Sequence, residues 1–331
     1  MFKSLAYRNF RLFFTGQVLS LCGAWMQITA QSWLVYRLTE DPLLLGLVTF
    51  VGQFPVFLLG FYAGIVVDRA SHYRIVFWTQ TLSMVQALLL AVLTLTGQVQ
   101  VWHVMCLALF LGLISAFDIP ARQVLIGELV EPADRPNAIA LNSFLVQVTR
   151  IMGPAIAGLL IAWKGEGACF AINAASFMSI LIALSLMRGV KQAPVQSAGS
   201  VWEEIGNGVS YALGREPIRI LLGLLTVFSV AGLPIYVLLP VFAKDILHSG
   251  AGGMGLLSSF SGVGATVGAM LLARRAHSRG MGSMIAGGVA LFGFGLIGLA
   301  ISTIFWVSCV CLWVMGLAAI QVLAGVNTLL Q

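Results

Sequence analysis

Charged residues are scarce in this sequence. Only 9% of its 331 residues are Asp, Glu, Lys or Arg, while 59% are hydrophobic. An ordinary soluble domain carries about 25% charged residues. A water-soluble protein of this size could not cover its surface with so few charges. The composition therefore predicts an integral membrane protein, all-α in fold class, with nearly all of the chain embedded in the bilayer.

Basic clusters, cysteine pairs and ligand clusters are also missing. The formal net charge is +6, but the basic residues stand one to three at a time between apolar runs, which argues against a nucleic-acid surface. All five cysteines fall inside apolar runs, where a thiol behaves as a small hydrophobe. The four histidines lie in or beside loops. We therefore expect no disulfide framework, no metal site and no cofactor.

Long apolar runs dominate what is present. A helix that crosses the hydrocarbon core needs about 20 apolar residues, and the first run is too long for a cleavable signal peptide. The sequence divides into ten predicted spans, at residues 12–36, 43–67, 75–96, 102–126, 137–163, 168–187, 218–243, 252–273, 281–302 and 304–328.

The loops carry an uneven distribution of basic residues, which predicts the orientation. With the N-terminus inside, the inner side collects fourteen Lys and Arg residues and the outer side collects only Arg37, Lys164 and Lys244. The inner set is Lys3, Arg8, Arg11, Arg69, Arg74, Arg122, Arg135, Arg188, Lys191, Arg215, Arg219, Arg274, Arg275 and Arg279. We expect a multi-pass protein of the inner (plasma) membrane with a cytoplasmic N-terminus.

One inner connection is much longer than the others and divides the chain. Residues 188–216 begin with Pro, Gln, Ser and Gly and continue with apolar residues at roughly helical spacing, which predicts an amphipathic helix at the membrane surface. We expect a six-helix bundle at 1–187, this linker at 188–216 and a four-helix partial bundle at 217–331. Helix sets repeated around a central loop are typical of secondary transporters, with the substrate site between the halves.

A short charged link joins the second and third spans. Gly60 and Gly64 lie four apart, a spacing that favours close helix contact, and Asp68, Arg69 and Arg74 follow at the inner end. So short a link predicts that the two helices are antiparallel and adjacent. Asp68 and Arg69 are placed to make charge-assisted hydrogen bonds with a neighbouring helix end. The alternative is that these charges only mark the membrane interface.

The link resembles the signature between helices two and three of the major facilitator superfamily, with Gly64, Asp68, Arg69 and Arg74 matching and Ser71 in place of the usual second glycine. Residues 117–123 and 150–154 together with Gly158 resemble the exporter subgroup that contains the enterobactin exporter. The second stretch is similar to the antiporter signature, in which Gly153, Pro154 and Gly158 are helix-bending positions.

The resemblance implies a fold of twelve helices, so the chain, which stops after its tenth predicted span, is expected to be truncated. It also implies an inner gate in which the acid at Asp68 faces the inner end of helix eleven. The arginine that proton-coupled relatives often carry higher in helix four has no counterpart between Leu107 and Ser115.

Charges inside the predicted spans are candidates for coupling or substrate binding, since burying one costs about 2.5 to 3.5 kcal/mol on insertion scales. Asp118 and Arg122 are four apart and able to pair with each other. Asp118 is the leading carboxylate for proton coupling. Arg150 lies midway along its span and either faces the central cavity as a substrate contact or binds Asp118 or a backbone carbonyl.

Polar residues within the spans are candidates for lining a wet cavity, with interhelical packing as the alternative for each. Gln27, Gln31 and Gln147 are the foremost of them.

These features together predict a secondary active transporter and not an enzyme. We expect a monomer in the lipid bilayer that exports small amphipathic compounds, such as drugs or siderophores, by alternating access. No phosphate-binding loop is found, so the energy is expected from a gradient of protons or another ion. The alternatives are a non-transporting membrane sensor or assembly partner, or an inactive truncated transporter; an intramembrane enzyme is a weaker third.

Overall fold

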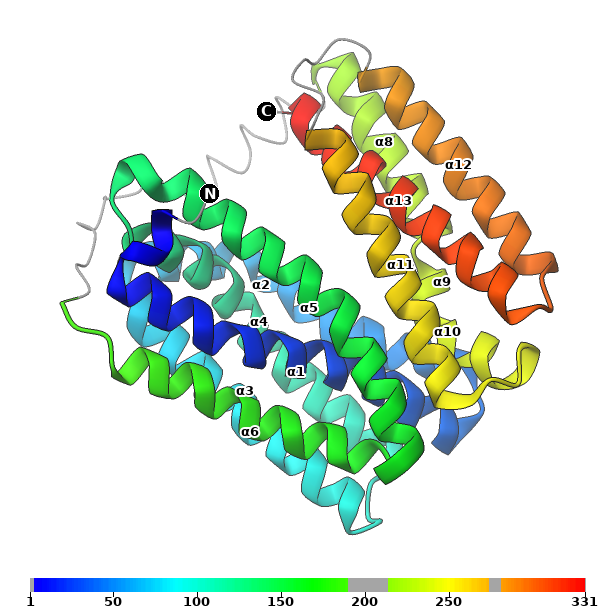
Figure 1. Cartoon of the computed structure of the whole chain (residues 1–331), viewed down its shortest axis with the longest axis horizontal. Coiled ribbons are helices and arrows are strands. Elements are labelled where there is room, and N and C mark those ends of the chain that lie inside the picture. The colour runs from blue at the N-terminus through cyan, green and yellow to red at the C-terminus, as the bar shows by residue number, and fades with distance from the viewer. Residues whose placement is uncertain (1–2, 190–213, 274–280, 331) are drawn as a thin grey trace. The chain divides into compact units, whose positions relative to one another are not determined.

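The computed structural model describes residues 3–189, 214–273 and 281–330, and every regular element in those ranges is helical (Figure 1). Two compact units are formed, Met1–Ala198 and Gly199–Gln331. The predicted amphipathic helix between Val201 and Leu213 lies outside the described residues, as do Lys191, Arg274, Arg275 and Arg279.

The first unit contains six long helices. They are α1 (Arg8–Thr39), α2 (Pro42–Arg69), α3 (His72–Leu95), α4 (Val101–Glu128), α5 (Arg135–Lys164) and α6 (Glu166–Ser185). Two short 3-10 turns, η1 (Lys3–Ala6) and η2 (Pro132–Asp134), precede α1 and α5. Side-chain caps mark two helix starts: Asp41 accepts a 2.8 Å hydrogen bond from the backbone N–H of Leu43, and Ser71 accepts from Arg74 N–H at 3.5 Å.

The second unit contains α8 (Glu216–Ala231), α9 (Pro234–Val237), α10 (Leu239–Val241), the π-turn η3 (Phe242–Ile246), α11 (Gly250–Ala273), α12 (Met281–Ile301) and α13 (Phe305–Leu330). The single span predicted at 218–243 is therefore interrupted. Its breaks fall at residues 232–233 and 238, shortly before Pro234 and Pro240, because proline lacks the N–H for the helical bond and its ring clashes with the preceding turn.

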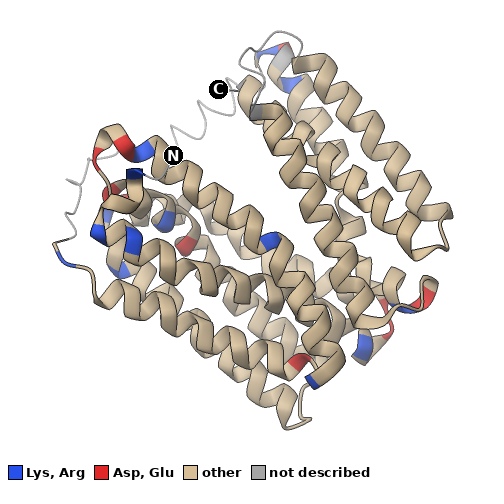
Figure 2. Ribbon diagram, viewed as in Figure 1, with Lys and Arg blue, Asp and Glu red and all other residues tan. Residues whose placement is uncertain are grey.

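Nine helical segments in the described ranges are long and apolar enough to cross a membrane. The counterpart of the first predicted span, α1, is not among them, although it has 32 residues. It is more polar than the others and buries Gln17, Ser20 and Gln27 against its neighbours. Figure 2 shows that most of the charged residues lie at or near the ends of the helices, with a few inside the helices of the first unit.

Close contacts at glycine bring some of the helices of the first unit together. α1 packs against α5 and α6, α3 against α4 and α6, and α2 against α4. A Cβ built on Gly112 would overlap the carbonyl oxygen of Gly52, so α2 and α4 approach at this pair of glycines. The prediction that α2 and α3 are adjacent is wrong beyond their short link, because α2 lies along α4 instead.

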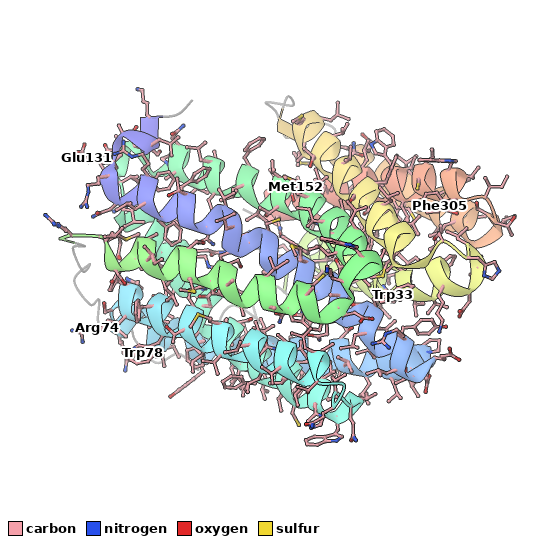
Figure 3. The ribbon with its side chains drawn as sticks, turned by 60° about the horizontal axis from the view of Figure 1, so that its bottom comes forward. Trp33, Arg74, Trp78, Glu131, Met152 and Phe305 are labelled. Carbon is pink, nitrogen blue, oxygen red and sulfur yellow. The ribbon has the colours of Figure 1, made fainter. Side chains whose placement is uncertain are left out.

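The hydrophobic core of the first unit lies at the end where α1, α3 and α5 begin and where α2, α4 and α6 end. Its largest fully buried members include Phe10, Phe13, Leu125, Ile180 and Leu184. This core closes one end of the bundle, the same end that carries the link between α2 and α3. Arg74 and Glu131 lie there, with Arg74 pointing away from the helices (Figure 3).

Candidate functional site

A cavity of about 320 Å³ lies within the first unit, among α1, α2, α3, α4 and α6. Its lining is apolar at positions such as Leu21, Ile28 and Phe177, and polar at eleven others. The polar residues are Ser20, Gln27, Gln31, Thr49, Gln53, Gln80, Ser83, Ser115, Asp118, Arg122 and Asn173. On α4 the lining residues recur at three- or four-residue spacing, so one face of that helix borders the cavity.

Asp118 is the most strongly bound polar group of the cavity. Its Oδ1 accepts hydrogen bonds from Thr79 Oγ1 at 2.6 Å and from Gln80 Nε2 at 2.9 Å. Its Oδ2 pairs with Arg122, one turn further along α4. The side chain of Arg122 is 22% exposed and that of Asp118 is 8% exposed. The predicted pairing of Asp118 with Arg122 is therefore present in the structure.

A second polar network crosses four helices at Gln27. Asn173 Nδ2 donates to Gln27 Oε1 at 2.7 Å, and Gln27 Nε2 donates to Gln86 Oε1 at 2.8 Å. Gln86 Nε2 then donates to the carbonyl oxygen of Leu107 at 3.3 Å. Both alternatives for Gln27 therefore hold, since its amide lines the cavity and also connects α1 to α3 and α6.

Two amides border the cavity without such partners. Gln31 on α1 and Gln53 on α2 line it, and neither makes a side-chain hydrogen bond to another described residue. Gln147 does not line the cavity and is half-buried on α5. Gln31 and Gln53 are therefore two amides of this cavity whose hydrogen-bonding capacity is left for a bound molecule or water.

Arg150 lies over the ring of Trp25, 5.7 Å from its centroid. A cation in this position is attracted by the negative face of the ring. Gly153 brings the helices together, since a Cβ there would lie 3.0 Å from the carbonyl oxygen of Cys22 on α1. Arg150 is not among the residues lining the cavity. The predicted alternative of a bond to Asp118 is wrong, because Asp118 pairs within α4.

The link between α2 and α3 is exposed. Among the residues that the structure describes, none forms an ion pair or hydrogen bond with the side chain of Asp68, Arg69 or Arg74. A Cβ built at Gly60 or Gly64 meets no atom within 4 Å. The close helix contact predicted for these glycines is therefore absent within the first unit, where Gly52 and Gly112 provide the approach of α2 to α4. Gly153, in contrast, lies against Cys22 and Trp25 of α1. Helix α5 is continuous through Pro154 and the buried Gly158.

Several residues of the site were not singled out from the sequence. Thr79, Gln80, Gln86 and Asn173 hold the cavity's polar groups. A polar side chain inside an apolar span is the available signal, since burying an unsatisfied amide is costly. That signal does not identify the partners, which lie up to 146 residues apart.

The full chain, residues 1–331, matches the model of one protein family, described as transmembrane secretion effectors. The chain belongs to this family of major facilitator transporters. Among relatives of this secretion effector, the "Staphyloferrin A transporter" of Staphylococcus aureus is 25% identical over 310 residues, covering 93% of this chain and 77% of that protein. "Macrolide efflux protein A" of Streptococcus pyogenes is 23% identical over 335 residues, covering 98% of this chain and 82% of that one.

Solved structures agree with the fold of this secretion effector. The nucleoside transporter NupG aligns with a TM-score of 0.71 at 15% identity, over 97% of this chain and 82% of that one. A bacterial homologue of the iron transporter ferroportin, in an inward-facing state, aligns with a TM-score of 0.65 at 17% identity, over 97% and 83%. The predicted all-α major facilitator fold is confirmed, and the secretion effector is a membrane transporter.

Proposed function

We propose that this secretion effector exports small amphipathic compounds by alternating access, using an ion gradient. The observation that carries the proposal is the cavity of the first unit, which combines apolar walls with unpartnered amides. Relatives named for staphyloferrin A and for macrolides support export of drug-like or siderophore-like molecules.

The cavity chemistry favours substrates that are recognised by hydrogen bonds. Asp118 and Arg122 neutralise each other, so the cavity has no net charge from its described lining. Gln31 and Gln53 offer donors and acceptors, while Leu21, Ile28 and Phe177 offer apolar contact. An uncharged molecule with several oxygen atoms and an apolar body fits this combination.

Asp118 is the proposed coupling group, with the proton as the coupling ion. Its carboxylate is buried in the cavity wall, and Pro120 lies between it and Arg122. Because proline removes one helical hydrogen bond, the winding of α4 at this point is free to change. Such a change separates Asp118 from Arg122 and lets the carboxylate take up a proton.

The remaining roles follow the family resemblance. The N-terminus is proposed to be cytoplasmic, with Gly60, Gly64, Asp68, Arg69 and Arg74 forming an inner gate. Residues 1–187 and 217–331 are proposed to be the two bundles of the transporter, joined by the linker 188–216. Gly153, Pro154 and Gly158 are proposed to bend α5, in a protein that acts as a monomer in the plasma membrane.

Inverted membrane vesicles containing the 331-residue chain test the proposal. We expect fluorescent amphipathic substrates to accumulate inside them when a proton gradient is imposed, and to leak out when it is collapsed. Gln31→Ala is expected to weaken apparent substrate affinity by about fivefold, the effect of one lost hydrogen bond. Gln147→Ala, outside the cavity, is the matched control. Absence of transport by well-folded protein contradicts the proposal and favours a sensor or assembly role.

A further inference from the structure

A buried histidine and a glutamate join two helix ends beside the exposed link. His72 is the first residue of α3 and Glu128 is the last residue of α4. The Nδ1 atom of His72 lies 2.9 Å from Glu128 Oε1, and their side chains are 8% and 10% exposed. A cavity of about 340 Å³ adjoins the pair and is bordered by both residues and by Arg74.

The other ring nitrogen of His72 is left without a partner. Nε2 is buried and makes no hydrogen bond to any described residue. In the neutral ring that donates from Nδ1 to Glu128, Nε2 keeps an unused lone pair; in the imidazolium it carries an unused N–H. Both protonation states leave one buried polar atom unsatisfied, so neither is stabilised by a second hydrogen bond.

The helix ends determine how protonation acts on the pair. A positive charge at the start of a helix and a negative charge at the end of one are each disfavoured by the helix dipole. Protonated His72 at the start of α3 and ionised Glu128 at the end of α4 are in these positions. Their mutual attraction offsets both effects, and loss of the proton from His72 leaves a weaker, neutral hydrogen bond.

Two arginines and a tyrosine, from α3 and α5, lie near the pair. Arg74 on α3 borders the same cavity, and Arg135 on α5 donates to the carbonyl oxygen of Gly127, next to Glu128, at 3.1 Å. The hydroxyl of Tyr73 is held by the carbonyl oxygen of Leu184 on α6 at 3.0 Å.

We propose that His72 is a proton-binding site whose protonation fastens the start of α3 to the end of α4. Histidine is the side chain whose ordinary charge change falls between about pH 5 and 8, so the site responds to pH at the end of the bundle that bears the link. This role rests on the proposed transport function and on the proposed cytoplasmic position of the N-terminus. With both, the site couples cytosolic acidity to the rigidity of the inner gate.

Hydrogen–deuterium exchange of the full chain in lipid nanodiscs tests the site without requiring transport. After correction for the chemical exchange rate, peptides covering residues 71–78 and 124–130 are expected to exchange about fivefold more slowly near pH 5.5 than near pH 8, the difference between charged and neutral hydrogen bonds. His72→Arg is expected to keep slow exchange at both pH values, and His72→Gln and Glu128→Gln to keep fast exchange.

His103→Gln, at the opposite end of α4, is the matched control and is expected to retain the wild-type pH response. A wild type with no pH response, or a full response in both His72→Gln and Glu128→Gln, overturns the proposal. Failure of the vesicle assay together with a normal exchange response removes the transport function while leaving the proton site, so the two outcomes are distinguishable.

Discussion

Replacing Asp118 by asparagine separates a structural role of the Asp118–Arg122 pair from a coupling role. Asparagine keeps acceptor capacity toward Thr79 and Gln80, which donate at 2.6 and 2.9 Å, but it leaves Arg122 without its counter-charge. Breaking a buried ion pair from one side costs about 3 to 5 kcal/mol. Because the Arg122 side chain is 22% exposed, water in the cavity offsets part of this, and we expect a loss of about 1 to 3 kcal/mol.

The double variant Asp118→Asn/Arg122→Gln gives the contrast. Removing both charges leaves no uncompensated ion, and replacement of a whole buried pair is often nearly neutral. We therefore expect the double variant to be more stable than the single one. At about 2 to 4 °C per kcal/mol for a unit of this size, the single variant should melt about 2 to 12 °C below wild type, and the double variant should recover most of that loss.

Tryptophan fluorescence during heating in detergent measures these midpoints, and vesicle transport supplies the second readout. If Asp118 couples the proton, both variants fail to accumulate substrate although the double variant is stable. Transport by the double variant would show that the pair is only structural. A single variant as stable as wild type, or a double variant less stable than the single one, refutes the energetic reasoning.

Two further predictions concern packing and the opposite end of the bundle. Gly112→Ala places a methyl group on the carbonyl oxygen of Gly52 and should lower the melting midpoint by about 2 to 12 °C. The control Gly46→Ala should leave the midpoint unchanged, because a Cβ at Gly46 meets no atom within 4 Å. Equal effects of the two variants would contradict the α2–α4 contact. Arg37→Gln should lower the melting midpoint more than Glu166→Gln in the same assay. Arg37→Gln leaves the Glu166 side chain unpaired at 7% exposure, whereas Glu166→Gln leaves the Arg37 side chain unpaired at 49% exposure, in contact with water. The reverse order would contradict this asymmetry.

The helices follow from local properties of the sequence. Apolar run length predicts where each begins and ends to within a few residues, and proline chemistry accounts for the interruptions of the seventh span shortly before Pro234 and Pro240. The Asp118–Arg122 pair could also be predicted from the sequence, because residues four apart share one helix face. These features depend on residues close together in the chain.

Helix neighbours and hydrogen-bond partners depend on residues far apart in the chain. The prediction that α2 and α3 pack together followed from their short link, but Gly52 and Gly112, sixty positions apart, determine that α2 packs on α4. Likewise, Asp118 is bound by side chains 38 and 39 residues away. Polarity marks such residues as requiring partners without indicating which ones.

The two kinds of helix contact differ in what movement they allow. α3 is tied to α1 and α4 by directed side-chain hydrogen bonds through Gln80, Gln86 and Asp118. Across the described residues, α2 makes no interhelical side-chain hydrogen bond of this kind, and its contact with α4 is the close approach of glycine backbones. Interhelical hydrogen bonds in membrane proteins contribute about 0.6 kcal/mol on average, and each must break if its helices slide. Among the described helices of the first unit, α2 is therefore the one whose displacement disrupts the fewest polar contacts. It carries both Gln53 beside the cavity and Asp68 at its exposed end.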